Sequence, residues 1–204
     1  MSDDLKIAVL ALQGDFREHR KMLDKLGVES FEVRQASDWQ KEKDGLILPG
    51  GESTTMLKLL NELGLMEVMK NDLQNGLSVY GTCAGLILLS SVVVGEERER
   101  FATMNITTRR NAYGRQLGSF YTEDFVRGID HKVPMTFIRA PYIESVGEGV
   151  EVLATVDGHI VAAKQGVQLV TSFHPELNED TSVHKFFLDM IKKNKPDSVW
   201  QQPA

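Results

Sequence analysis

Short apolar runs alternate with amphipathic segments along the first half of the chain. The runs at 6–12, 28–33, 45–48 and 77–80 have the length and composition of buried strands. Segments 15–25 and 53–63 carry apolar residues at helical spacing, and Asp15 with Glu18 three positions later predicts a capping box at the start of the first. This alternation predicts an α/β fold with a mostly parallel, doubly wound sheet.

The second half of the chain is richer in strands. They are expected near 104–108, 118–121, 135–138, 151–156, 159–164 and 167–172, and Asp157-Gly158 predicts a hairpin, so this half should add antiparallel strands. A final amphipathic helix is predicted over 180–193. The chain shows no internal repeat or linker, which predicts one domain over 1–194 followed by a polar tail at 195–204. The mixed charge run at 96–100 is interpreted as a solvated loop.

Composition narrows the classes of function. With 204 residues, 42% of them hydrophobic, the chain is long enough to bury one sizeable core. A net charge of −6 argues against a nucleic-acid partner. No stretch approaches twenty apolar residues, so neither export nor membrane insertion is expected. A single cysteine excludes a disulfide framework within the chain and fits a reducing cytoplasm.

That cysteine, Cys83, stands between two pairs of small residues, Gly81-Thr82 and Ala84-Gly85, where an apolar strand meets an apolar helix. Taken alone, such a cysteine is more often a buried small hydrophobe than a reactive group. A G-x-nucleophile-x-G turn, however, lifts its side chain above the sheet and directs backbone N–H groups of the following helix toward the same point. The pattern therefore makes Cys83 a candidate nucleophile.

A candidate base follows much later in the sequence, where a β-rich run ends at His174 and continues through Pro175 to Glu176. In an extended segment, side chains two positions apart point the same way, so Glu176 could hold one ring nitrogen while the other faces the thiol. Each residue alone is more easily explained as a satisfied polar contact. Together with Cys83 they form the pattern of an activated nucleophile.

A glycine-rich segment, Pro49-Gly50-Gly51-Glu52-Ser53, runs from a strand into a helix. Free N–H groups in such a loop can stabilise the oxyanion of acyl transfer. The spacing does not match a phosphate-binding loop, since no lysine lies at the required position. The five histidines and one cysteine show no pair at metal-ligand spacing, so no metal is expected.

Together these segments resemble the class I glutamine amidotransferases, and more narrowly the glutaminase subunits of pyridoxal 5'-phosphate synthase. The blocks that carry the narrower resemblance span nearly the whole chain in order: 12–14 (LQG), 17–19 (REH), 48–55 (LPGGESTT), 81–86 (GTCAGL), 110–111 with 114–116, 137–141 (FIRAP), 162–166 (AAKQG) and 172–177 (SFHPEL).

The resemblance implies hydrolysis of L-glutamine to L-glutamate and ammonia without a cofactor. Cys83 would be the nucleophile, His174 the general base and later acid, and Glu176 the orienting carboxylate. The oxyanion would be bound by the N–H groups of Gly51 and Ala84. The substrate would be contacted by Gly51, Glu52, Ser53, Arg110, Ile138 and Arg139.

Charge chemistry supports these substrate contacts in part. An arginine at 110 suits the α-carboxylate of glutamine, and Glu52 could accept from the α-ammonium. A surface role for the arginine stays open, because Arg109 is adjacent and charge alone does not choose between them.

The resemblance also implies a partner. Ammonia released into water is protonated and lost to synthesis, so a one-domain glutaminase needs a separate synthase subunit to receive it. We expect that subunit to dock on the face carrying residues 13–19 and the loops near Cys83. We also expect docking to fix the conformation of the oxyanion loop.

Other functions remain to be weighed. A γ-glutamyl hydrolase or an intracellular peptidase could share the elbow, although such peptidases commonly take an acid from the end of the first strand, where this chain has Gln13. A thioesterase of the α/β-hydrolase type would place its acid before the histidine. A non-catalytic regulatory subunit would keep the fold without turnover.

Overall fold

The structure, a computed structural model of the chain, describes residues 5–110 and 118–195. Within this part a ten-stranded sheet forms the centre, in the order β2-β1-β3-β4-β12-β11-β9-β6-β5, with β10 paired to β11. Its strands are β1 (Lys6–Leu10), β2 (Glu29–Val33), β3 (Gly45–Leu48), β4 (Ser78–Thr82), β5 (Ser90–Val93), β6 (Met104–Arg109), β9 (Tyr142–Val146), β10 (Val150–Val156), β11 (His159–Gln165) and β12 (Gln168–Thr171).

The sheet changes character along its width. From β2 to β12 every neighbouring pair is parallel. Beyond β12 the pairs β12–β11, β11–β10, β11–β9 and β9–β6 are antiparallel, and the outermost pair β6–β5 is parallel again. The predicted fold class, a mostly parallel doubly wound sheet with added antiparallel strands in the C-terminal half, is confirmed.

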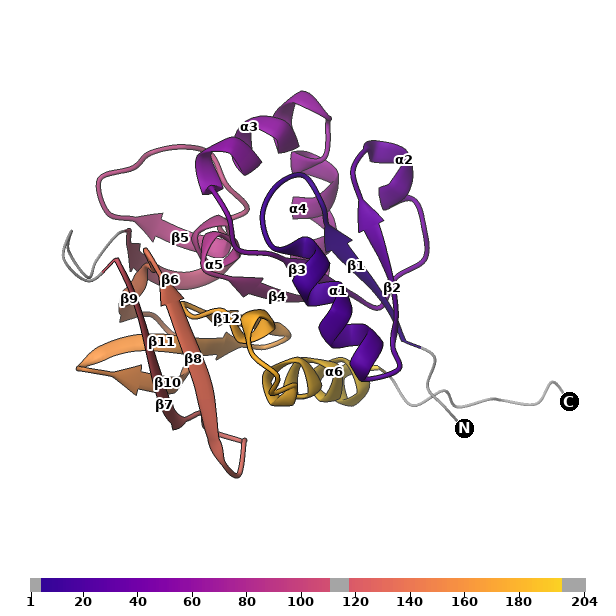
Figure 1. Cartoon of the computed structure of the whole chain (residues 1–204). Coiled ribbons are helices and arrows are strands. Elements are labelled where there is room, and N and C mark those ends of the chain that lie inside the picture. Colours follow the sequence, from indigo (N-terminus) through magenta and orange to yellow (C-terminus); the bar gives the residue numbers. More distant parts are fainter. Residues whose placement is uncertain (1–4, 111–117, 196–204) are drawn as a thin grey trace, which may run out of the picture.

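Helices cover both faces of the sheet (Figure 1). They are α1 (Phe16–Lys25), α2 (Ala36–Trp39), α3 (Ser53–Glu62), α4 (Met66–Gln74), α5 (Ala84–Leu89) and α6 (Ser182–Asn194), with a 3-10 turn, η1, at Pro175–Leu177. The strands alternate between two cores, because successive side chains point to opposite faces. Ile7 and Val9 of β1 pack with α1 and α6, whereas Ala8 and Leu10 pack with α3, α4 and α5.

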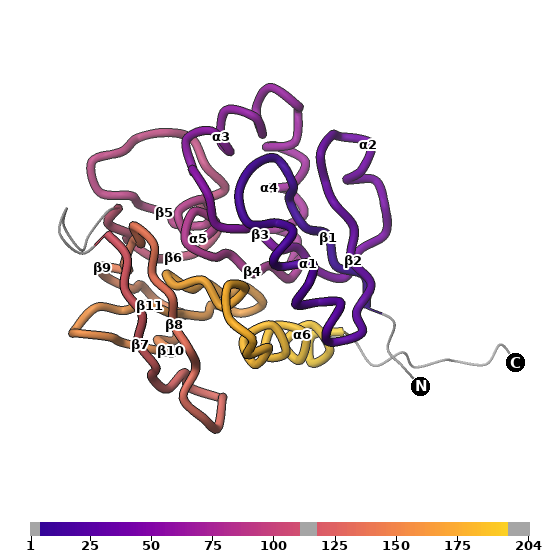
Figure 2. Tube along the Cα trace, in the orientation of Figure 1, coloured from indigo at the N-terminus to yellow at the C-terminus, as the bar shows by residue number. Residues whose placement is uncertain are grey.

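A separate hairpin, β7 (Ser119–Phe125) and β8 (Lys132–Ile138), forms its own antiparallel sheet. The tube in Figure 2 shows this hairpin extending away from the central sheet on the side of β10 and β11. Val133, Met135 and Phe137 of β8 point inward and join the core that contains α6. The hairpin therefore packs beside the segment that follows β12.

Most predicted elements are present, with ends shifted by a few residues. The sequence reading missed α2, α4, β5 and β9, which are short or lack a clear period. The predicted tail at 195–204 lies outside the described residues except for Lys195, whose Nζ is 2.8 Å from Asp44 Oδ1. None of the helices in the described ranges is both long and apolar enough to cross a membrane.

Candidate active site

Cys83 lies on a sharp turn between β4 and α5. Its φ of 48° is in the left-handed region, which a non-glycine residue rarely adopts and which is typical of strained functional turns. Gly85 makes the turn sterically allowed, because a Cβ there would lie 2.2 Å from the carbonyl oxygen of Leu48. A Cβ on Gly81 would likewise meet the backbone of Gly85 at 2.7 Å. The predicted elbow geometry is thus present.

The sheet brings His174 to Cys83. β4 and β12 are parallel neighbours with Thr82 opposite Thr171, and the N–H of Cys83 donates to the Thr171 carbonyl oxygen over 2.8 Å. Both strands therefore end at the same edge, one leading into Cys83 and the other, within three residues, into His174. This edge is the carboxyl end of the strands, where open α/β sheets bind ligands.

The three side chains of the predicted triad, Cys83, His174 and Glu176, lie at this edge. His174 Nδ1 donates to Glu176 Oε1 over 2.6 Å. The Cys83 side chain also interacts with this ring and helps to raise the pKa of His174. All three residues are buried, with 7% of Cys83 exposed. The predicted contact between Glu176 and His174 is present, but the extended geometry predicted for it is wrong. Residues 175–177 form a 3-10 turn, which directs the Glu176 carboxylate back onto the imidazole ring.

Asp15 is a further carboxylate in the site that sequence reading missed. We expected it to cap α1, but its side chain makes no capping hydrogen bond there; its Oδ2 lies 3.4 Å from His174 Nδ1. Burial by itself lowers the pKa of His174, and the hydrogen bonds to Asp15, Cys83 and Glu176 outweigh burial and raise it. The site therefore stabilises an imidazolium. The position of Asp15 after the carboxyl end of β1 could have indicated this role, because the predicted triad lies at the same edge of the sheet.

The glycine loop after β3 packs directly on this histidine. A Cβ on Gly50 would lie 2.3 Å from the His174 ring, so only glycine fits there. The loop is held from the other side by the segment after β1: the N–H of Asp15 donates to the Gly50 carbonyl oxygen over 3.0 Å, and the N–H of Glu52 donates to Gln13 Oε1 over 2.7 Å. The two predicted oxyanion donors, Gly51 and Ala84, thus belong to backbone segments fixed beside the triad.

Glu52 has a structural task besides any contact with substrate. Its carboxylate accepts from the N–H groups of Thr54 and Thr55 at the start of α3, and these bonds, working against burial, lower its pKa to about 2. Arg110 Nη2 reaches Glu52 Oε1 at 3.4 Å, and Arg110 Nη1 donates to Glu96 Oε2 over 2.5 Å. Ser53, next in the chain, is buried at the first position of α3. Three predicted substrate residues therefore lie together.

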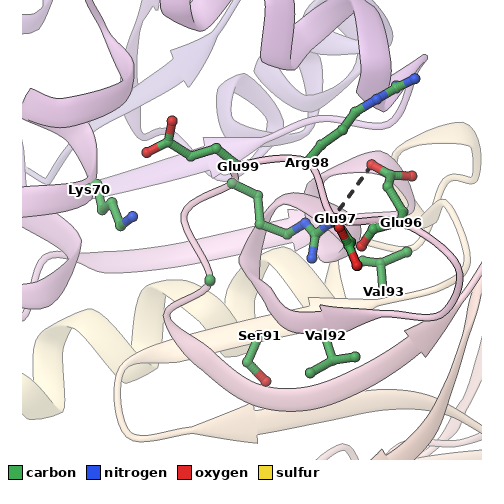
Figure 3. A pocket seen from close by; sticks show the side chains of 10 residues that line it. Lys70, Ser91, Val92, Val93, Glu96, Glu97, Arg98 and Glu99 are labelled. Carbon is green, nitrogen blue, oxygen red and sulfur yellow. Dashed lines mark hydrogen bonds and ion pairs between the residues drawn. The ribbon is translucent and has the colours of Figure 1, made fainter.

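Contrary to the sequence interpretation, the run at 96–100 is not simply a solvated loop. Arg100 is buried, the Glu96 side chain is 11% exposed, and Arg98 Nη1 donates to Thr54 Oγ1 over 2.6 Å. The run connects Arg110 to α3. A cavity of about 410 Å³ lies beside it, lined by residues of β5, by 96–100 and by Ala102 and Lys70 (Figure 3). No triad residue lines this cavity.

Ile138 and Arg139 come from the end of β8. The hairpin is joined to the triad segment by the N–H of His174, which donates to the Thr136 carbonyl oxygen over 2.8 Å. Ile138 is 41% exposed, and Arg139 is exposed with a φ of 44°. These two residues follow Thr136, the backbone contact of His174, by two and three positions. Asn111 and residues 114–116 of the resembling blocks lie outside the described residues.

Asp15, His174 and Glu176 also place one candidate metal-ligand atom each within 4.8 Å of the others. The ring nitrogen among these atoms already donates to Glu176, so a metal there would have to displace the triad hydrogen bond. We therefore interpret the cluster as a histidine held by two carboxylates.

Comparison with known proteins decides the family. The model of the SNO glutamine amidotransferase family matches residues 9–193. The chain belongs to this family. Proteins named pyridoxal 5'-phosphate synthase subunit PdxT are 54% identical to it in Streptococcus pneumoniae strain CGSP14, over 94% of this chain and all of that protein, and in Haemophilus influenzae strain PittEE, over 92% and 99%.

Solved structures agree with this assignment. A crystal structure of a glutamine amidotransferase superposes with a TM-score of 0.86 at 44% identity, covering 91% of this chain and 98% of that one. A putative GMP synthase protein from Thermoplasma acidophilum shares the fold at 17% identity and a TM-score of 0.67, covering 95% of this chain and 96% of that one. Family membership removes the thioesterase alternative, and it weakens the peptidase alternative even though Asp15 supplies a carboxylate near the end of the first strand.

Proposed function

We propose that this protein hydrolyses L-glutamine to L-glutamate and ammonia and supplies the ammonia to a pyridoxal 5'-phosphate synthase subunit. The observation that carries the proposal is the assembly of Cys83, His174 and Glu176 at the carboxyl edge of the sheet in a member of the SNO glutamine amidotransferase family. The names of the relatives, at 54% identity over nearly the full chain, support the synthase as the destination of the ammonia.

The first half of the reaction forms a thioester. Cys83 transfers its proton to His174, and the thiolate sulfur attacks the γ-carboxamide carbon of glutamine. The carbonyl π electrons move to oxygen, and this oxyanion is bound by the N–H groups of Gly51 and Ala84. Ala84 is the first residue of α5, so its N–H has no partner within the helix. His174 then protonates the departing nitrogen, the C–N bond breaks, and ammonia leaves.

The second half regenerates the enzyme. His174, now neutral, takes a proton from a water molecule, whose oxygen attacks the thioester carbon. The C–S bond breaks, the sulfur regains a proton from His174, and glutamate is released. Glu176 keeps Nδ1 of His174 protonated in both halves, so that Nε2 exchanges protons with sulfur and substrate.

Substrate orientation is assigned to the residues around this centre. Arg110 is the cation for the α-carboxylate, although Glu96 and Glu52 already contact it and set its position. Gly51, Glu52 and Ser53 bind from the loop after β3. Ile138 and Arg139 bind from the end of β8.

A synthase partner completes the proposed function. Ammonia in water is protonated and lost as a nucleophile, so release into a covered path is needed. We assign docking to the face that carries residues 13–19, of which His19 itself is buried, and the loops near Cys83, because this segment contacts the oxyanion loop through Gln13 and Asp15. An unpaired Cys83 fits a reducing compartment, and the cytoplasm is the proposed location.

The test is product formation by a reconstituted pair. The protein and its synthase partner are mixed with pentose and triose phosphates, and pyridoxal 5'-phosphate is measured with either glutamine or an ammonium salt as nitrogen source. We expect product from both sources with wild-type protein and from ammonium alone with Cys83→Ala.

Four outcomes would count against the proposal. Product from glutamine with Cys83→Ala would exclude the triad as the source of ammonia. Hydrolysis of glutamine without any transfer to the synthase would favour a γ-glutamyl hydrolase, and no hydrolysis at all would favour a regulatory subunit. Equal rates of glutamine hydrolysis with and without synthase would argue against control by docking.

A further inference from the structure

Beneath the triad lies a cluster of polar side chains that the proposed mechanism does not use. His19 of α1, His184 of α6 and Thr82 of β4 have none of their surface exposed, and Tyr80 of β4 packs edge-on against both imidazole rings. His19 Nε2 lies 3.7 Å from Glu176 Oε2. Each buried imidazole needs hydrogen-bond partners for its ring nitrogens, because burial removes them from water.

Glu176 has one oxygen that the triad leaves without a donor. Oε1 accepts from His174, whereas Oε2 is buried and has no hydrogen-bond partner among the described residues. Burial raises the pKa of Glu176, so without a second donor the carboxylate is less able to stay charged. His19 Nε2, 3.7 Å away, is a potential donor to this oxygen.

The proton positions in the imidazole pair follow from their contacts. His19 Nδ1 and His184 Nε2 are 2.9 Å apart, so one of these two atoms carries the shared hydrogen. Burial, followed for His19 by the neighbouring histidines, lowers the pKa of both rings, to about 3 for His184. Each ring is therefore neutral and carries one proton.

One arrangement of the two imidazole protons satisfies more hydrogen-bonding groups than the other. If His184 Nε2–H donates to His19 Nδ1, the proton of His19 lies on Nε2, which is 3.0 Å from Thr82 Oγ1 and faces Glu176. The reverse arrangement would bury a proton on His184 Nδ1, an atom with no acceptor among the described residues, and would turn a lone pair of His19 toward a carboxylate. The first arrangement is favoured.

We propose that His19 is a positioning residue for the triad: His184 fixes its tautomer, and its Nε2–H holds Glu176 Oε2 while Oε1 stays on His174. The separation of 3.7 Å is longer than a hydrogen bond, and catalytic hydrogen bonds often tighten when substrate binds. The same N–H lies 3.0 Å from Thr82 Oγ1, so it is shared between Glu176 and Thr82, the residue that directly precedes the nucleophile. His19 thus connects the two ends of the site without touching substrate. This inference deepens the proposed function and rests on it.

The direct test is the tautomer of His19 in the wild-type protein. Two-bond proton–nitrogen NMR spectra of the protein labelled with ¹⁵N-histidine distinguish the two ring nitrogens, and His19→Gln and His184→Gln assign the signals. We expect both rings to be neutral and to carry their protons on Nε2. A proton on Nδ1 of His19, or a charged ring near neutral pH, would overturn the proposal. This readout does not depend on activity, so it stands even if glutamine hydrolysis is not observed.

The kinetic test compares two substitutions at one position in the complex with synthase. His19→Leu removes the donor at similar volume, and His19→Gln places an amide N–H near the position of Nε2. We expect His19→Leu to lower kcat about 10- to 100-fold with little change in KM, the loss typical of removing an outer partner of a catalytic group. The acid limb of its pH profile should move to higher pH. His19→Gln should recover most of both.

Tyr80→Phe is the matched control. It removes a buried hydroxyl in the same cluster, one whose hydrogen bond goes to Thr171. We expect it to lower the unfolding temperature and to leave kcat and the pH profile unchanged. If His19→Leu and Tyr80→Phe reduced kcat in proportion to their loss of stability, or if His19→Gln gave no recovery, His19 would be part of the core and not a positioning residue.

Discussion

Replacing Asp15 by Asn should shift the alkaline limb of the pH profile for glutamine hydrolysis to lower pH. His174 must carry a proton when it donates to the leaving nitrogen, and this form is lost as pH rises through the pKa of His174. Asp15 Oδ2 lies 3.4 Å from His174 Nδ1 and helps to raise that pKa. An asparagine keeps the size of the side chain and removes its charge.

The size of the shift follows from the distance. Two unit charges 3.4 Å apart interact by about 1.2 kcal/mol when the dielectric constant is that of water, and by more when burial lowers it. Because the Asp15 side chain is 35% exposed, the value for water is used as the lower limit. One pKa unit corresponds to about 1.4 kcal/mol, so the limb should move by at least about 0.9 units.

The assay is kcat/KM for glutamate release, measured in the complex with synthase across the pH range in which the complex stays intact. Asp24→Asn, on the exposed side of α1, the helix that Asp15 precedes, is the control and should leave the profile in place. An unchanged alkaline limb in Asp15→Asn, or a shift to higher pH, would refute the reasoning that Asp15 stabilises the imidazolium.

Two further substitutions test the backbone around the site. Glu52→Ala removes the cap of α3 and should lower the free energy of unfolding by about 1 kcal/mol. Because the pKa of Glu52 is lowered to about 2, this loss should be constant near neutral pH and should become smaller as the pH falls toward 2. Thermal unfolding at several pH values measures it. Gly85→Ala places a Cβ 2.2 Å from the Leu48 carbonyl oxygen, so it should destabilise the protein by about 3 kcal/mol or more and abolish glutaminase activity. A Cβ at Gly118 meets no atom within 4 Å, so the control Gly118→Ala should change neither stability nor activity. Equal stability of the two variants would contradict the close packing of the elbow.

Much of the fold was predictable because its strands are short apolar runs with clear ends. The run at 45–48 became β3 at those residues, and Asp157-Gly158 forms the turn between β10 and β11 as expected. The missed helix α4 buries only Met66, Met69 and Leu73, and the exposed apolar Val68 falls outside their helical spacing. Edge strand β5 was not predicted, because its apolar residues follow α5 without a break.

The candidate site was predictable where the motif itself fixes the geometry. The small residues around Cys83 specify an elbow, and the late histidine with its glutamate specifies a base. Contacts between segments far apart in the sequence were not predictable: Asp15 was expected to cap its own helix, and the charges at 96–100 were expected to face water. Whether such a side chain turns to its neighbours in sequence or to another loop depends on packing that only the folded chain defines.

The most direct test of the triad is the mass of the protein during turnover. We expect glutamine added to the complex, quenched in acid within the first turnovers, to give a protein carrying one γ-glutamyl group on the peptide that contains Cys83. Cys83→Ala should give neither the adduct nor ammonia. Ammonia release at the wild-type rate by Cys83→Ala, or an adduct on another residue, would contradict the account.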